Sequence, residues 1–235
     1  SVDGNMIVSG ITTFGGAVNF PSTSGNVITA GKLGIGFTDT NIKVGSGALD
    51  SLTTGTHNTA VGHNALTANT SANRNTAVGR HALTANTTGE DNVGIGYHAL
   101  VENTTGEDNV AVGSYALDAN TTASNNVAIG YYALTSNVTG FNNVAVGVNA
   151  LYTNTASNNT AIGRDALKLS TADNCVAVGS LALAANSTGA ANVAVGYGAL
   201  NDNTTGNYNI AIGGGALDTN TTGDNNVAMG INALT

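Results

Sequence analysis

Residues 109–125 read NVAVGSYALDANTTASN, and this phrase decides the fold because close copies of it fill the chain from residue 41 to residue 235. Successive copies begin 17 residues apart, except for two steps of 16 residues in the middle. A unit this short cannot bury its apolar side chains alone and must stack on its neighbours. The repeat therefore predicts a rod of twelve stacked coils. Each coil contains one glycine that marks it: Gly45, Gly62, Gly79, Gly96, Gly113, Gly130, Gly147, Gly163, Gly179, Gly196, Gly213 and Gly230.

We number the positions of a coil from its opening residue, so that Asn109 is position 1 and Gly113 is position 5. Positions 2 and 4 are Val, Ile or Thr in every coil except for Met229 at position 4. This alternation is typical of a short strand with one buried face. We therefore expect the side chains of positions 2 and 4 to point into the coil.

Position 3 lies on the opposite face of the strand and is alanine in ten of the twelve coils. A column of small side chains on that face indicates that another backbone approaches it closely, and an identical chain is the simplest candidate. We therefore expect these alanines to form the interface between copies of the chain: Ala60, Ala77, Ala111, Ala128, Ala145, Ala161, Ala177, Ala194, Ala211 and Ala228.

The rest of the coil carries a corner, a core residue and a turn. The glycine at position 5 suits a corner with positive φ or with no room for a Cβ atom. Ala-Leu follows at positions 8 and 9 in all coils, which predicts one inward leucine per coil. Position 12 is asparagine in nine of the eleven complete coils. Stacked asparagines at positions 1 and 12 can form amide ladders along a shaft of roughly 50 to 55 Å, at about 4.8 Å per coil.

Two departures from the period stand together. Residues 143–158 and 159–174 form the two 16-residue coils, so we expect a local change of the turn there. Cys175 then replaces the opening asparagine of the next coil, and we expect a buried thiol that interrupts the ladder.

Composition excludes several classes of protein. Only 9% of the residues are charged and the net charge is -8, so no basic surface for nucleic acid is expected. Cys175 is the only cysteine, which leaves no intrachain disulfide, and no metal or cofactor motif is found. No apolar run is long enough for membrane insertion, and no signal peptide begins the chain, which indicates another export route or a fragment. Residues 1–40 lack the repeat and are expected to be a short-strand cap or connector to the repeat domain at 41–235, whose last coil is truncated.

The phrase Asn-Val-Ala-Val-Gly followed by Ala-Leu, as in residues 109–117 and 192–200, resembles the repeats of trimeric YadA-like adhesin heads. It is also similar to the repeats of bacteriophage tail fibres and of related fibres in predatory bacteria. The resemblance covers residues 41–235, although the 17-residue period is longer than that of the adhesin heads. It implies a parallel homotrimer of left-handed β-rolls, intertwined or side by side, displayed outside a bacterial cell or on a virion. The alanine column would then be the trimer interface.

The variable positions 6 and 7, just after the glycine corner, are where a ligand site is expected. Aromatics make up only 5% of the chain, yet they gather at these positions over consecutive coils. Aromatic rings beside imidazole and guanidinium donors suit sugar stacking and hydrogen bonding, although stacking within a trimer interface explains them at least as well. A metal site at His81 and His98 is a weaker option. The candidates are His63, Arg80, His81, Tyr97, His98, Tyr115, Tyr131 and Tyr132.

No catalytic group is expected, so the chain is predicted not to be an enzyme. Glu90-Asp91 and Glu107-Asp108 recur in successive turns and are expected to be a solvated acidic column in preference to a Ca²⁺ site. We expect an extracellular structural fibre segment that supports or mediates recognition of a cell-surface glycan. The alternatives are an ice- or mineral-binding threonine array, a spacer shaft that binds nothing and, least favoured, a glycan-cleaving tailspike. Adjacent threonines such as Thr87-Thr88 argue against a flat threonine array, since neighbours in a strand point to opposite faces.

Overall fold

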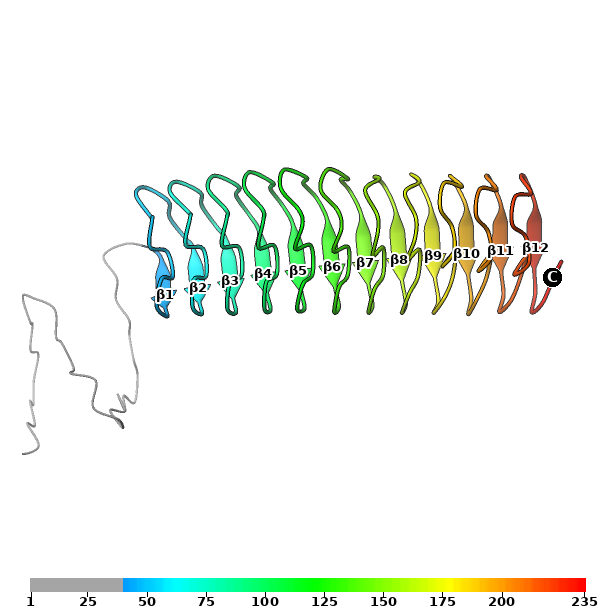
Figure 1. Cartoon of the computed structure of the whole chain (residues 1–235), viewed down its shortest axis with the longest axis horizontal. Coiled ribbons are helices and arrows are strands. Elements are labelled where there is room, and N and C mark those ends of the chain that lie inside the picture. Colours follow the sequence, from blue (N-terminus) through cyan, green and yellow to red (C-terminus); the bar gives the residue numbers. More distant parts are fainter. Residues whose placement is uncertain (1–39) are drawn as a thin grey trace, which may run out of the picture. The chain divides into compact units, whose positions relative to one another are not determined.

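The computed structural model describes residues 40–235, and the expected connector at 1–40 lies outside them except for Thr40. Within this range the chain forms a β-solenoid in which each coil contributes one strand of three residues (Figure 1). The strands are β1 Ile42–Val44, β2 Thr59–Val61, β3 Thr76–Val78, β4 Val93–Ile95, β5 Val110–Val112, β6 Val127–Ile129, β7 Val144–Val146, β8 Thr160–Ile162, β9 Val176–Val178, β10 Val193–Val195, β11 Ile210–Ile212 and β12 Val227–Met229.

The twelve strands form a single parallel sheet in the order of the sequence. Each strand pairs with the next at the equivalent position, as Ala111 of β5 does with Ala128 of β6. The register holds through the two 16-residue coils, where Ala145 of β7 pairs with Ala161 of β8 and Ala161 pairs with Ala177 of β9. The prediction of an all-β, parallel solenoid with a period of about 17 residues is therefore confirmed.

The interior of the solenoid is narrow, and alanine and leucine fill it. Leu117 at position 9 is fully buried, as are Ala111 at position 3 and Ala116 at position 8. A Cβ atom added to Gly94, the position-3 residue of β4, would lie 3.2 Å from Cγ of Leu83. The position-3 residue therefore faces a leucine across the core, and a side chain larger than alanine would not fit there. The predicted inward leucine is confirmed.

The strand faces are the reverse of the prediction. Side chains at positions 2 and 4 point outward, and Ile95, Ile129 and Ile162 are 39%, 40% and 41% exposed. The position-3 alanines are shielded within their own chain, so the prediction that they form the interface with a partner chain is wrong. The core is too narrow for Val or Ile opposite leucine, which leaves the smallest side chain of the strand inside. The alanines concerned are Ala60, Ala77, Ala111, Ala128, Ala145, Ala161, Ala177, Ala194, Ala211 and Ala228.

The glycine at position 5 is required on both grounds that the sequence suggested. Gly113 has a φ of 137°, and a Cβ atom there would lie 2.5 Å from the carbonyl oxygen of Gly130 in the next coil. The backbone then takes left-handed conformations at positions 7 and 9, where Tyr115 has a φ of 59° and Leu117 one of 51°. A leucine in this region is strained, and its complete burial offsets that cost.

Two columns of asparagine hold the coils together. The predicted amide ladder forms at position 12, where Nδ2 of Asn120 donates to Oδ1 of Asn103 at 2.7 Å and to the Ala123 carbonyl at 3.0 Å. At position 1 the ladder consists mainly of bonds between side chain and backbone, since the backbone N–H of Asn126 donates to Oδ1 of Asn109 at 3.0 Å. No buried side-chain nitrogen or oxygen in residues 40–235 lacks a partner.

Cys175 keeps part of the asparagine pattern that it replaces. It is fully buried, as expected, and its Sγ donates to the Gly189 carbonyl at 3.3 Å, the bond that Nδ2 of an asparagine makes in other coils. Burial raises the pKa of the thiol above its ordinary value. The ladder changes at this coil because a sulfur is a much weaker acceptor than an amide oxygen.

Candidate functional site

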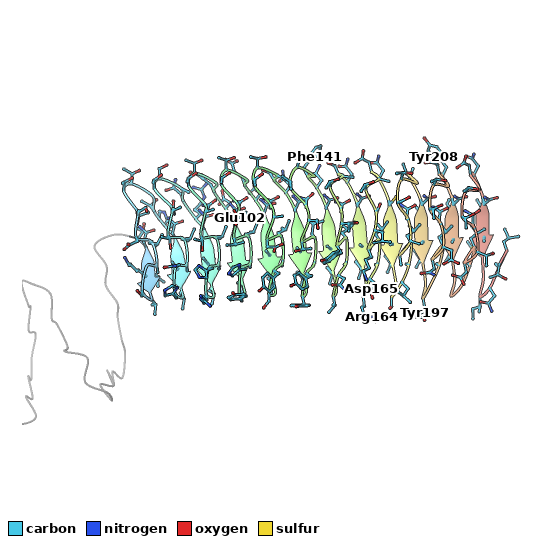
Figure 2. All side chains as sticks on the ribbon, viewed as in Figure 1. Glu102, Phe141, Arg164, Asp165, Tyr197 and Tyr208 are labelled. Carbon is cyan, nitrogen blue, oxygen red and sulfur yellow. The ribbon has the colours of Figure 1, made fainter. Side chains whose placement is uncertain are left out.

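The side chains of positions 6 and 7 lie along one edge of the solenoid, which we call the corner edge. The glycine corner ends each strand and turns the chain, so the next two residues project at the same place in every coil. Figure 2 shows Arg164, Asp165 and Tyr197 along this edge and Phe141 and Tyr208 along the opposite one. Because the period is nearly constant, residues of one position form a continuous column.

Aromatic rings occupy this column in consecutive coils and contact one another. The position-7 rings of His81, His98, Tyr115 and Tyr132 follow one another with centroids between 5.0 and 5.5 Å apart. Two position-6 rings pack beside them, Tyr97 on His98 and Tyr131 on Tyr132, both at 4.2 Å. We call this cluster the aromatic ladder; its members are His63, His81, Tyr97, His98, Tyr115, Tyr131, Tyr132 and Tyr152.

The structure brings all eight candidate residues of the sequence analysis into one cluster. Arg80, the only one that is not aromatic, places its guanidinium carbon 5.7 Å from the centroid of the Tyr97 ring, in a cation–π contact. Sequence reasoning missed Tyr152, which is at position 10 and reaches Tyr132 at 5.9 Å. Position 10 lies beside position 7 on this edge. A tyrosine at position 10 of the coil that follows Tyr132 was therefore the sequence feature that could have predicted this contact.

Each ring of the ladder contacts at least one neighbouring ring of the same chain. Burial, followed by the charges of Arg80 and the neighbouring histidines, lowers the pKa of His81 in the ladder. A hydrogen bond to Tyr131 raises the pKa of Tyr132 to about 12. Tyr131, which is 49% exposed, is the most exposed tyrosine of the ladder. Stacking within the chain thus accounts for most of these aromatics, and the open edges are what a ligand could contact.

Two carboxylates near the ladder are bonded within the chain. Asp118 at position 10 accepts a hydrogen bond from the Thr135 hydroxyl, and partial burial raises the pKa of this carboxyl. Asp165 lies 3.3 Å from Nζ of Lys168 and accepts a bond from Asn149 at 3.0 Å. Although burial acts to raise the pKa of Asp165, these bonds outweigh it and the pKa is lowered.

The acidic turns lie on the opposite edge and are partly neutralised. Arg74 forms ion pairs with Glu90 at 2.5 Å and with Asp91 at 2.7 Å. The hydrogen bond from Arg74 lowers the pKa of the Asp91 carboxyl. Within residues 40–235 no group of three or more His, Cys, Asp or Glu side chains is placed to hold a metal ion. Glu90 and Asp91 are therefore ion-pair partners of Arg74 in this fold.

Comparisons of the chain with protein-family models, with curated proteins and with solved structures found no match. The described part of the chain also contains no helix of the length and apolarity needed to cross a membrane. The functional argument consequently depends on the surfaces of the solenoid itself.

Proposed function

We propose that this chain is a structural segment of an extracellular fibre, of the adhesin or tail-fibre kind, which assembles as a parallel homotrimer and supports recognition of a cell-surface glycan. The observation that carries the proposal is the outward face of the sheet, positions 2 and 4 of β1–β12, which we call the apolar face. It replaces the alanine column as the surface through which copies of the chain contact one another.

The apolar face is long, narrow and uncharged. It holds two columns of β-branched side chains, with Met229 as the only exception, and none of its residues is ionisable. Twelve strands at about 4.8 Å give a strip of roughly 50 to 55 Å, and a width of two side chains gives an area of the order of 500 Å². An exposed apolar patch of this size is as large as the largest patch of a typical monomeric protein, and such patches are often functional.

The shape of the apolar face favours a threefold arrangement. A strip only two side chains wide is small beside the roughly 800 Å² that each partner contributes to a standard pairwise interface. Three such strips that converge on a common axis cover one another along their full length. Parallel chains in register would place each Val or Ile against its own copies, and the absence of charge avoids a desolvation cost.

Recognition is assigned to the corner edge, which borders the apolar face and stays outside such a trimer. Its exposed tyrosine edges, with Arg80 beside Tyr97, offer the stacking surfaces and hydrogen-bond donors that bind sugars. If the edge binds no glycan, the segment is a spacer shaft, which remains the second candidate.

The threonine-array alternative is less well supported by the hydrogen bonds. The hydroxyl groups of Thr87, Thr104 and Thr204 at position 13 each donate to a carbonyl of the next coil at 2.9 to 3.1 Å. These hydroxyls therefore serve the stacking of the coils and are not free to order water. On the apolar face itself, position 2 is threonine in only three strands, at Thr59, Thr76 and Thr160.

The mass of the protein in solution tests the assembly. The chain has a mass of 23.2 kDa, and light scattering on the protein eluting from a size-exclusion column should give three times that mass. Ile129→Glu on the apolar face would place three carboxylates around the axis and should give monomers. Phe141→Glu is the matched control, because Phe141 is similarly exposed but lies on the opposite edge. A monomeric wild type, or a trimer unaffected by Ile129→Glu, would overturn the assembly.

A glycan array tests the recognition. Binding that is lost in Tyr115→Ala and Tyr132→Ala would support a ligand site on the aromatic ladder. An array on which the wild-type protein binds nothing would leave the spacer shaft as the function of this segment.

A further inference from the structure

A second feature of the corner edge lies outside the aromatic ladder. Over the coils of β9 to β12 the edge is hollowed by a cavity of about 490 Å³, which we call the glycine notch. Its walls are formed by Leu181 and Tyr197 on one side and by Ile231 and Asn232 on the other, with Asp218 between them. Cavities of about 300 to 1,000 Å³ are the size at which proteins bind small molecules.

The notch exists because side chains are missing, while the backbone keeps its course. Position 7 is glycine in two consecutive coils, Gly198 and Gly215, where the ladder has histidine or tyrosine. Gly198 has a φ of 62°, close to the 59° of Tyr115, so the backbone there accepts a large residue. A Cβ atom on Gly198 would meet nothing closer than Oδ1 of Asp218, at 4.0 Å.

The length of the notch is set by the coil spacing. Leu181 and Asn232 occupy position 7 of coils three steps apart, which places equivalent backbone atoms roughly 14 Å from one another. Oδ1 of Asn232 lies 2.5 Å from where a Cβ atom of Gly215 would be, so the Asn232 side chain leans over Gly215 and closes that end. The space between the two walls is long enough to admit a sugar ring.

The groups that line the notch have free binding capacity. Tyr197 is 68% exposed, and among the described residues no aromatic ring packs on it, unlike Tyr97 and Tyr131 at the same position. The Asp218 carboxylate accepts no hydrogen bond from the described part of the chain, in contrast to Asp118 and its Thr135 partner. Asn201 uses its Nδ2 on Asp202 at 2.8 Å, which leaves its Oδ1 as an acceptor.

We propose that the glycine notch binds a single neutral pyranose ring of a glycan. The free face of Tyr197 and the Ile231 side chain suit the C–H face of a sugar, while Asp218 and Asn201 accept hydrogen bonds from its hydroxyl groups. The sugar is neutral because no basic residue lines the notch, and Asp218 in a chain of net charge -8 repels carboxylates and phosphates. The notch deepens the proposed recognition of a glycan and rests on it, but it is complete within one chain.

Saturation-transfer NMR on the full chain tests the site with defined probes. The neutral probes are the methyl glycosides of glucose, galactose and mannose, and the anionic probes are glucuronic acid and N-acetylneuraminic acid. At least one neutral glycoside should receive saturation from the protein, and the two acids should receive none. No transfer to any neutral glycoside, or stronger transfer to the acids, would overturn the proposal.

Two variants locate the binding, one by removal and one by filling. Tyr197→Ala removes the platform and should weaken the affinity at least tenfold. Gly198→Tyr should do the same by filling the notch with a ring that packs against Tyr197, since the rings of Tyr131 and Tyr132 at the same two positions lie 4.2 Å apart. Tyr208→Ala is the matched control, because Tyr208 is 65% exposed on the opposite edge and its removal should leave binding unchanged. Unchanged affinity in folded Tyr197→Ala protein would overturn the site.

The same measurement separates this site from the ladder and from the trimer. A sugar in the notch should depend on Tyr197 and a sugar on the ladder should depend on Tyr115, because Tyr115 lies five coils from Gly198. Ile129→Glu protein should retain binding of the neutral glycoside, since the notch needs no partner chain. Loss of binding in Tyr115→Ala, with Tyr197→Ala unaffected, would assign the sugar to the aromatic ladder and reject the notch.

Discussion

Tyr115 and Tyr132 stack with ring planes 15° apart and centroids 5.0 Å apart, one coil above the other. This separation is close to the rise of a parallel β-stack, about 4.8 Å, which is also a favourable distance for aromatic contact. The solenoid therefore lets a single position build a continuous column of rings without any change of backbone. The aromatic ladder is a structural element of the shaft as well as a candidate binding surface.

Removal of a central ring should destabilise the shaft. Tyr115 contacts His98, Tyr97, Tyr131 and Tyr132, so Tyr115→Ala deletes four ring contacts at once. We expect the melting temperature to fall by about 2 to 4 °C or more, measured by circular dichroism. Tyr115→Phe retains the ring and should melt within about 1 °C of the wild type. Equal melting of the two variants would show that the ring contacts contribute nothing.

Acidification should weaken the fold through His81 of the ladder. Burial and the charges of Arg80, His98 and His63 lower the pKa of His81 from its ordinary value of 6.5. The unfolded chain therefore takes up the proton first, so this contribution to stability is present above pH 6.5 and is lost as the pH falls through the folded-state pKa. Melting curves across this range should show a decrease that is smaller in His81→Gln. An identical pH profile for the wild type and His81→Gln would contradict the assignment.

The glycine corners should tolerate no side chain, whereas Gly214 in the notch should. Gly113→Ala would place its Cβ atom 2.5 Å from the Gly130 carbonyl oxygen at a φ of 137°. We expect the free energy of unfolding to decrease by about 3 kcal/mol or more, or the variant not to fold at all. Denaturant unfolding measures the decrease, and limited proteolysis detects a failure to fold. Gly214→Ala is the control, because the nearest atom to its Cβ atom would be the Tyr197 carbonyl oxygen at 3.8 Å. Similar unfolding of both variants would contradict the role of the corner.

The repeat predicted the period, the strands and the inward leucine, but not which strand face is inside. Alternation along Val110, Ala111 and Val112 shows only that the two faces differ. The choice is made by the opposite wall of the coil, where Leu117 takes most of the interior and leaves room for alanine alone. That wall adopts left-handed backbone at leucine, which residue preferences do not predict, so the width of the interior could not be inferred from the sequence.

The aromatic ladder was predictable because a fixed period aligns equal positions into columns. Its eighth ring, Tyr152, was not predicted because positions 7 and 10 become neighbours only through the turn between them. The glycine notch was missed for a different reason. Gly198 and Gly215 add no chemistry of their own, and the cavity follows only once the flanking side chains are placed in space.

Cys175→Asn should stabilise the protein by restoring the position-1 asparagine. The new Nδ2 would donate to the Gly189 carbonyl, and Oδ1 would accept the Asn192 amide, as Oδ1 of Asn192 accepts the Asn209 amide at 2.8 Å. We expect a gain of about 1 kcal/mol in the free energy of unfolding by guanidinium titration. Cys175→Ala is the control and should lose about 1 to 3 kcal/mol, because it leaves both backbone groups without a side-chain partner. If the asparagine variant is no more stable than the alanine variant, the side-chain to backbone ladder does not hold the coils together at this position.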